Sequence, residues 1–180
     1  MKPLIRLTLI LALSLSACAA DNALSGAEVL NRWVGGKWVS SGQFVDSAYS
    51  KANTASATTK CAWSPDHVFV ICDQNILFGG QPMRDLSIYT FAPKNGKYYF
   101  YGISLGEEKA RNTALEITDN GQRWVYANTA EIQGKPVQFR TTNQFHGNDN
   151  VEWWTEFSTD DGKTWTKTGS GKETREKAGN

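Results

Sequence analysis

The sequence predicts an all-β protein, an antiparallel up-and-down β-barrel of about ten strands with a short N-terminal helix. Seven Trp, six Tyr and eight Phe occur among its 180 residues, and aromatic residues are enriched in strands. After residue 36, apolar and polar residues alternate with a period of two, as they do in strands that bury one face. No long helix-forming run follows residue 34. Without crossover helices, neighbouring strands must run antiparallel.

Turn-forming clusters separate the predicted strands. They are Lys94-Asn95-Gly96, Asp119-Asn120-Gly121, Gln133-Gly134-Lys135, Gly147-Asn148-Asp149 and Asp160-Asp161-Gly162. Residues 137–145 and 151–157 show the clearest alternation, and we expect one face of each to be buried. Closure of the sheet into a barrel would remove its unpaired edges. A β-sandwich is the alternative arrangement of the same strands.

A short helix precedes the first predicted strand. Ser25 and Glu28 have the spacing of a capping box, in which each side chain binds a backbone amide at the start of a helix. We expect the helix to extend to about Trp33 and to end at Gly35-Gly36. The first strand then begins at Lys37.

The tripeptide Gly36-Lys37-Trp38, after a helix and at the start of a strand, resembles the Gly-x-Trp signature of the lipocalin and calycin barrels. The resemblance implies that Trp38 plugs one barrel end and that a basic residue of the last strand lies across it. Arg175 is the candidate for this cation–π contact. The second lipocalin motif, around Thr-Asp-Tyr, is absent.

A further resemblance, over most of the chain after residue 35, is to the DUF1579-like family of uncharacterised bacterial β-barrel proteins. It is carried by Gly36-Lys37-Trp38, Tyr89-Thr90-Phe91-Ala92-Pro93, Gly96-Lys97-Tyr98, Asp119-Asn120-Gly121-Gln122-Arg123-Trp124 and the segment 156–165. These are turn and core motifs, so the resemblance implies a fold and transfers no catalytic residue. Within the last segment, residues 158–165 also match a single Asp-box of the sialidase propellers, which we interpret as a hairpin turn.

The first residues have the character of a secretion signal. Lys2 and Arg6 precede an apolar run over 7–15, which is shorter than the roughly 20 residues that a membrane-spanning helix needs. Leu15-Ser16-Ala17-Cys18 resembles the lipobox of bacterial lipoproteins, which implies a lipid on Cys18. Ala19 and Ala20 resemble sorting signals for the outer rather than the inner membrane, with the protein facing the periplasm. Ordinary cleavage after Ala20 is the alternative.

These features divide the chain into a signal peptide (1–17), a lipid-anchored tether with the short helix (18–35) and a lipocalin-like barrel (36–176). Loss of Lys2 and Arg6 lowers the formal net charge from +1 to −1 (+1 − 2). A chain without excess positive charge is not expected to bind nucleic acid.

With Cys18 assigned to lipid, Cys61 and Cys72 remain, and an oxidising compartment favours a disulfide between them. They flank the turn-forming cluster Ser64-Pro65-Asp66-His67. If residues 64 and 69 close this hairpin, Cys61 lies opposite Cys72. Two free thiols or a metal pair are the alternatives. No histidine adjoins either cysteine, and we predict no metal site.

Aromatic pairs on alternate positions indicate a ligand site. Tyr99 with Tyr101, and Trp124 with Tyr126, each share one face of a strand. If those faces point inward, they line a pocket for a small hydrophobic or amphipathic molecule; alternatively, the rings fill the barrel. We predict no cofactor, although His146 at a barrel mouth would allow haem ligation of the nitrobindin type, against an ordinary surface histidine.

The sequence thus favours a lipid-anchored binding module of the cell envelope. An enzyme, an isomerase or hydrolase acting through carboxylates such as Glu152 and Glu156 in the same cavity, is the second hypothesis. A structural or interaction lipoprotein with a filled barrel is the third. No Gly-x-Ser-x-Gly nucleophile motif is present, and no catalytic residue is assigned.

Overall fold

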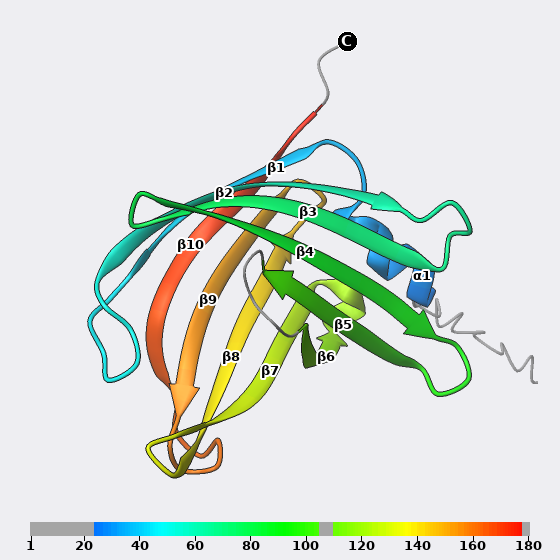
Figure 1. Ribbon diagram of the computed structural model, residues 1–180. Coiled ribbons are helices and arrows are strands. Elements are labelled where there is room, and N and C mark those ends of the chain that lie inside the picture. Colours follow the sequence, from blue (N-terminus) through cyan, green and yellow to red (C-terminus); the bar gives the residue numbers. More distant parts are fainter. Residues whose placement is uncertain (1–23, 105–109, 178–180) are drawn as a thin grey trace, which may run out of the picture.

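A computed structural model describes residues 24–104 and 110–177 of the protein. The ten strands are β1 (Lys37–Phe44), β2 (Asn53–Trp63), β3 (Phe69–Phe78), β4 (Gln81–Ala92), β5 (Lys97–Ser104), β6 (Arg111–Thr118), β7 (Arg123–Ile132), β8 (Lys135–His146), β9 (Asn150–Ser158) and β10 (Thr166–Glu176). Each strand pairs antiparallel with its neighbours in the sequence, and β1 pairs with β10 to close the barrel (Figure 1). The predicted all-β barrel is confirmed, and the β-sandwich is excluded.

In the described part of the chain, no helix has both the length and the apolar character that a membrane crossing requires. The predicted signal peptide, 1–17, and Cys18 lie outside the described residues.

All five turn clusters predicted from the sequence connect strands. The Asp-box match is one such turn: the Asp160 carboxylate accepts hydrogen bonds from the Ser158 hydroxyl (2.8 Å) and the Thr164 amide (2.9 Å). Trp165 Nε1 donates to the Gly162 carbonyl (2.9 Å). Hydrogen bonds from the Thr164 side chain and amide lower the pKa of Asp160 to about 2. These contacts stabilise the hairpin between β9 and β10, so the interpretation of residues 158–165 as a hairpin turn is confirmed.

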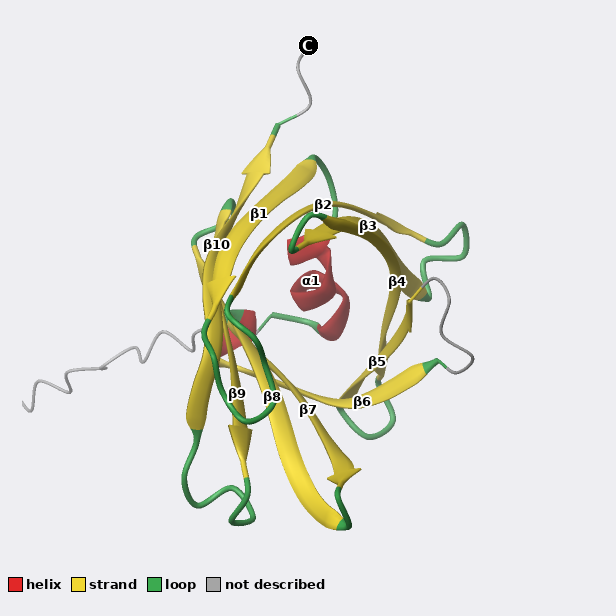
Figure 2. Cartoon of the chain, turned by 60° about the vertical axis from the view of Figure 1, so that its left-hand side comes forward, coloured by secondary structure: helices red, strands yellow, loops and turns green. Residues whose placement is uncertain are grey.

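The N-terminal helical segment lies across one end of the barrel (Figure 2). Helix α1 (Gly26–Leu30) is followed directly by the 3-10 helix η1 (Asn31–Trp33). The capping box is present: the Ser25 amide donates to Glu28 (2.7 Å), and the Glu28 amide donates to the Ser25 hydroxyl (3.3 Å). Val29, Leu30 and Trp33 are buried against the barrel interior. The segment therefore closes this end.

The closed end is filled by four large rings, those of Trp33, Trp38, Trp124 and Phe145, which we call the plug. Trp33 packs edge-on against Trp38, Trp124 and Phe145, with ring centroids 5.1, 6.0 and 5.0 Å away. The indole nitrogens of Trp38 and Trp124 donate to the carbonyls of Trp33 (3.0 Å) and Gly121 (2.9 Å). Burial of these rings gives a large apolar contribution to stability, although the indole nitrogen of Trp33 is buried without a hydrogen-bond partner among the described residues.

Arg175, near the end of β10, joins this plug to the barrel wall. Its guanidinium lies 4.4 Å from the centre of the Trp38 ring, so the cation–π contact predicted for these residues is present. It also donates to the carbonyls of Val34 (2.6 Å) and Asn148 (2.8 Å) and to that of Arg32. One side chain thus links the helical segment, the first and last strands and the turn between β8 and β9.

Cys61 and Cys72 form the predicted disulfide across β2 and β3, with their Cα atoms 4.0 Å apart. The hairpin closes as expected, because the Ser64 amide donates to the Phe69 carbonyl (2.8 Å) and Cys61 pairs in register with Cys72. His67 lies in the turn and stacks on the Trp63 ring, with centroids 5.7 Å apart.

Replacement of Arg175 by Ala tests the plug. The change leaves several carbonyls at the closed end without their donor and removes the contact with Trp38, so we expect the free energy of unfolding in urea to fall by about 3 kcal/mol. Arg84→Ala is the control, because its ion pair with Asp73 is solvent-exposed and should contribute below about 1 kcal/mol. Equal losses in the two variants would contradict the role assigned to Arg175.

Candidate functional site

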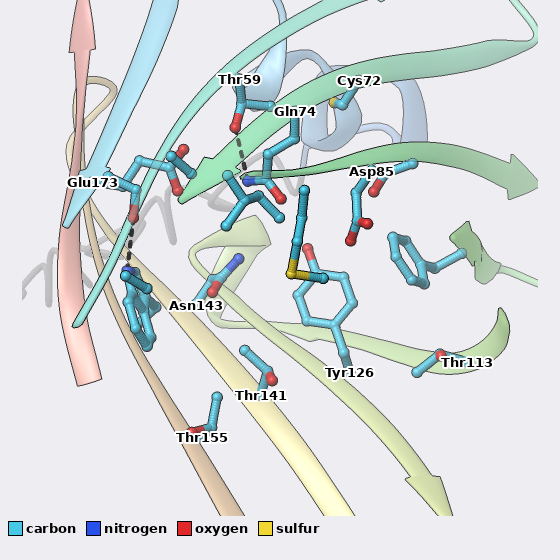
Figure 3. A pocket seen from close by; sticks show the side chains of 18 of the residues that line it. Thr59, Cys72, Gln74, Asp85, Thr113, Tyr126, Thr141, Asn143, Thr155 and Glu173 are labelled. Carbon is cyan, nitrogen blue, oxygen red and sulfur yellow. Dashed lines mark hydrogen bonds between the residues drawn. The ribbon is translucent and has the colours of Figure 1, made fainter. Parts of the chain in front are cut away.

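Above the plug, the barrel holds a cavity of about 440 Å³. This volume lies within the range of small-molecule pockets. Its apolar lining includes Phe44, Ile76, Phe78, Met83, Phe100 and Trp153, and its polar lining includes Ser40, Thr59, Gln74, Thr141, Asn143 and Thr155. The side chains come from every strand of the barrel, and those labelled in Figure 3 are mostly polar.

Small residues on adjacent strands leave the room for this cavity. Ala55 and Ala57 face it from β2. Gly42 and Gly171 form part of the wall behind the Trp153 ring; a Cβ atom at either position would lie 2.2 or 2.5 Å from that ring. A side chain at Gly42 or Gly171 would collide both with the indole and with a backbone oxygen, that of Ser170 (2.6 Å) or Ser41 (2.2 Å), so these positions require glycine for the wall to hold the indole as it does.

Glu173 is a buried acidic group in this cavity. Strand pairing places it opposite Ser40 of β1 and Val151 of β9, on the inner face of β10. The residue is 6% exposed, and its Oε1 atom has no hydrogen-bond partner in the described part of the chain. Burial raises the pKa of Glu173 to about 7, because removal from water disfavours the charged form.

Two tyrosines accompany Glu173 on the cavity wall. The hydroxyl groups of Tyr89 and Tyr126 lie 3.4 Å apart. Burial raises the pKa of Tyr89 to about 12. It also raises the pKa of Tyr126 well above its ordinary value, with Tyr89 and Glu173 adding smaller contributions of the same sign. Both phenols therefore stay protonated at neutral pH, and this part of the wall offers neutral hydroxyl groups.

A second polar cluster, farther along the cavity, contains Asp85, Arg111 and Ser104. Arg111 forms an ion pair with Asp85 (2.8 Å) and donates to the Ser104 hydroxyl (2.7 Å). Oδ1 of Asp85 is buried without a hydrogen-bond partner in the described residues. This cluster combines both signs of charge, whereas no ion pair of Glu173 is present among the described residues.

Only one of the four residues predicted to bind a ligand lines the cavity. Tyr126 does so, but Trp124 is fully buried in the closed end below it. The inward orientation expected for Tyr99 and Tyr101 is wrong. Phe100 pairs in register with Tyr89 and faces the cavity, so its neighbours on β5 point outward, and the Tyr99 hydroxyl accepts a hydrogen bond from Asn95 in an exposed position.

The other chemical candidates lie on the outside of the barrel. Phe145 points into the barrel, so its neighbour His146 on β8 points outward; the His146 side chain is 59% exposed and lies 3.7 Å from Glu152. Glu156 pairs with Arg140 (2.7 Å), and the Arg140 guanidinium lies over the Trp165 ring (3.9 Å). Among the described residues, no group of three or more His, Cys, Asp or Glu side chains is arranged to hold a metal ion.

The sequence contained one signal for Glu173 that was missed. The Gly-x-Trp resemblance implies that Arg175 of the last strand lies across Trp38, and a side chain that covers the barrel end must point inward. Because successive residues of a strand alternate between faces, Glu173 shares that face. Asp85 and Arg111 gave no such signal, since charged residues at strand positions are ordinarily solvated.

Comparison with known proteins gives a fold relationship. No family model and no curated protein matches the sequence. Among solved structures, the S-type phycobiliprotein lyase CPES from Guillardia theta matches with a TM-score of 0.59 and 10% sequence identity, over 87% of this chain and 95% of that chain. At this identity the match shows a common β-barrel fold and no more.

The raised pKa of Glu173 predicts a pH-dependent stability. At pH values below the ordinary pKa of 4.5, the residue is protonated in both the folded and the unfolded chain. As the pH rises, the unfolded chain loses this proton first, so stability falls until the folded-state pKa of about 7 is passed. The accumulated loss is about 3 kcal/mol.

Glu173→Gln removes this titration while keeping the shape of the side chain. We expect the variant to gain stability relative to the unaltered protein as the pH rises from 4.5 to 8, measured by urea unfolding at several pH values. Taking the difference between the two proteins cancels the titration of other groups. A difference that is constant over this range would show that Glu173 is not buried as described.

Proposed function

We propose that the protein binds a small hydrophobic or amphipathic molecule inside its barrel. The observation that carries this proposal is the 440 Å³ cavity, closed at one end by the aromatic plug and lined by both rings and isolated polar groups. Apolar walls with few polar groups are typical of sites that bind and orient small ligands. A filled barrel with a purely structural role does not account for this space.

The solved structure with the same fold supports the use of such a barrel as a functional site, but it does not identify a ligand. It is a phycobiliprotein lyase, so the lipocalin-like barrel can be adapted to an activity; its substrate is not transferred to this chain. We also propose a relationship to the DUF1579-like barrel family on the turn and core motifs of the sequence, and this relationship adds no functional residue.

We further propose that Cys18 carries a lipid that anchors the barrel to a membrane, with the outer membrane favoured and the barrel facing the periplasm. The support is the lipobox-like sequence Leu15-Ser16-Ala17-Cys18 after a short apolar run. A disulfide between Cys61 and Cys72 agrees with an oxidising compartment. An anchored barrel would hold an apolar ligand close to a bilayer.

Filling the cavity tests the binding proposal. Ala57 lines the cavity from β2, and Ala57→Phe places a ring in the space that a ligand would occupy. We expect the fluorescence increase of N-phenyl-1-naphthylamine, an uncharged apolar probe, to show binding that the variant weakens at least about tenfold, because overlap with a ring removes most of the apolar contact area.

The matched control is Thr58→Phe, which adds the same ring one residue away on the exposed outer face. This variant should bind the probe as the unaltered protein does, and circular dichroism should show the same fold for all three proteins. Unchanged probe binding by Ala57→Phe would place the probe outside the cavity and count against the proposal.

Replacement of the lipid-bearing residue tests the anchor. Cys18→Ala removes the thiol to which the diacylglyceryl group would be attached, so we expect the protein to move from the membrane fraction to the soluble fraction after cell lysis. Immunoblotting of the two fractions measures this, with Cys72→Ala as a control for general effects of cysteine loss. Membrane association that persists in Cys18→Ala would exclude the anchor.

A further inference from the structure

We propose that the ligand carries a protonated nitrogen on an apolar ring system, and that the Glu173 carboxylate binds this cation inside the cavity. The inference rests on the proposed binding function and specifies its ligand class. It assigns to Glu173 the polar contact that orients the ligand.

The first argument is the state of Glu173 itself. The residue is 94% buried (100% − 6%), lines the cavity, and has an oxygen without a partner in the described residues. Figure 3 shows its side chain directed from β10 into the space that Tyr126 and Asn143 border on the other side. A buried acid is ordinarily paired or replaced, because an isolated charge is costly away from water. A ligand cation would provide the missing partner.

The second argument is the charge of the cavity. Among the described residues that line it, three are charged: Asp85, Arg111 and Glu173. Arg111 already pairs with Asp85, so when Glu173 is ionised the lining has an excess negative charge. A carboxylate or phosphate ligand would meet this charge unfavourably, whereas an ammonium group would neutralise it. Oδ1 of Asp85 adds a second acceptor without a partner among the described residues.

The third argument is the position of the aromatic walls. Trp153 Nε1 donates to the hydroxyl of Ser40 (3.0 Å), and Ser40 is the register partner of Glu173. The indole nitrogen is therefore bound to the residue that lies opposite Glu173 on the neighbouring strand, and Gly42 and Gly171 leave the ring space against the wall. A ring that packs on Trp153 would bring an attached ammonium group to Glu173, with cation–π attraction adding to the ion pair.

Three probes of similar size separate the contribution of the ionic contact from that of the apolar contacts: 1-naphthylmethylamine, 1-naphthylmethanol and 1-naphthoate. Their binding to the full chain is measured by isothermal titration calorimetry at pH 8, where Glu173 is ionised. We expect the amine to bind at least about tenfold more tightly than the alcohol, and the carboxylate to bind more weakly than both, as a charge-assisted contact in a buried site requires.

Glu173→Gln should abolish the advantage of the amine and leave alcohol binding within about twofold of the unaltered protein, because only the ionic contact is removed. Glu116→Gln is the matched control: Glu116 lies on β6 in an exposed position, so the same loss of charge should leave all three affinities unchanged. Circular dichroism confirms that each variant is folded.

The outcomes distinguish this inference from the proposed function. If the alcohol binds but the amine has no advantage, or if Glu173→Gln retains that advantage, the cation site is wrong while the cavity remains a binding site. If neither the three naphthyl probes nor N-phenyl-1-naphthylamine binds, the proposed function fails together with the inference.

Discussion

The arrangement of the barrel depends on the contact between Arg175 and Trp38. Arg175 lies on the last strand and Trp38 on the first, so their stacking at 4.4 Å reinforces the pairing that closes the sheet. A planar guanidinium has enough donors to bind the carbonyls of the helical segment at the same time, which a lysine ammonium could not do in this geometry. Closure of the sheet and closure of one barrel end are therefore achieved by the same side chain.

This closed end determines where a cavity can form. The plug concentrates four large rings, Trp33, Trp38, Trp124 and Phe145, in one layer. The next layers contain smaller residues, among them Ser40, Ala57 and Gly171, which cannot fill a ten-stranded barrel. The interior is consequently packed with side chains at the closed end and contains the cavity above it. The four rings belong to one cluster of buried apolar residues, whereas the cavity lining also includes polar groups, which a fully packed apolar core would not tolerate.

The sequence predicted features that depend on local chemistry. The capping box of Ser25 and Glu28, the hairpin turns, the disulfide and the contact of Arg175 with Trp38 are all present. The facing of β5 could not be predicted, because Tyr98 to Tyr101 are aromatic on both faces and periodicity then gives no direction. The pairing of Phe100 with Tyr89 on β4 determines that Phe100 faces the cavity and that Tyr99 and Tyr101 face outward. Charged residues such as Asp85 were missed because their burial depends on contacts between strands distant in sequence.

Glu173 and Arg175 show why the candidate site lies directly above the plug. They are two residues apart on the same face of β10, yet their surroundings differ. Arg175 reaches backbone carbonyls of the helical segment and of the turn between β8 and β9. No described residue makes a comparable hydrogen bond to Oε1 of Glu173, and the phenols of Tyr89 and Tyr126 bind each other. The residues at the closed end therefore bind Arg175 but do not reach Glu173. The proposed ligand would supply the partner that Oε1 of Glu173 lacks among the described residues.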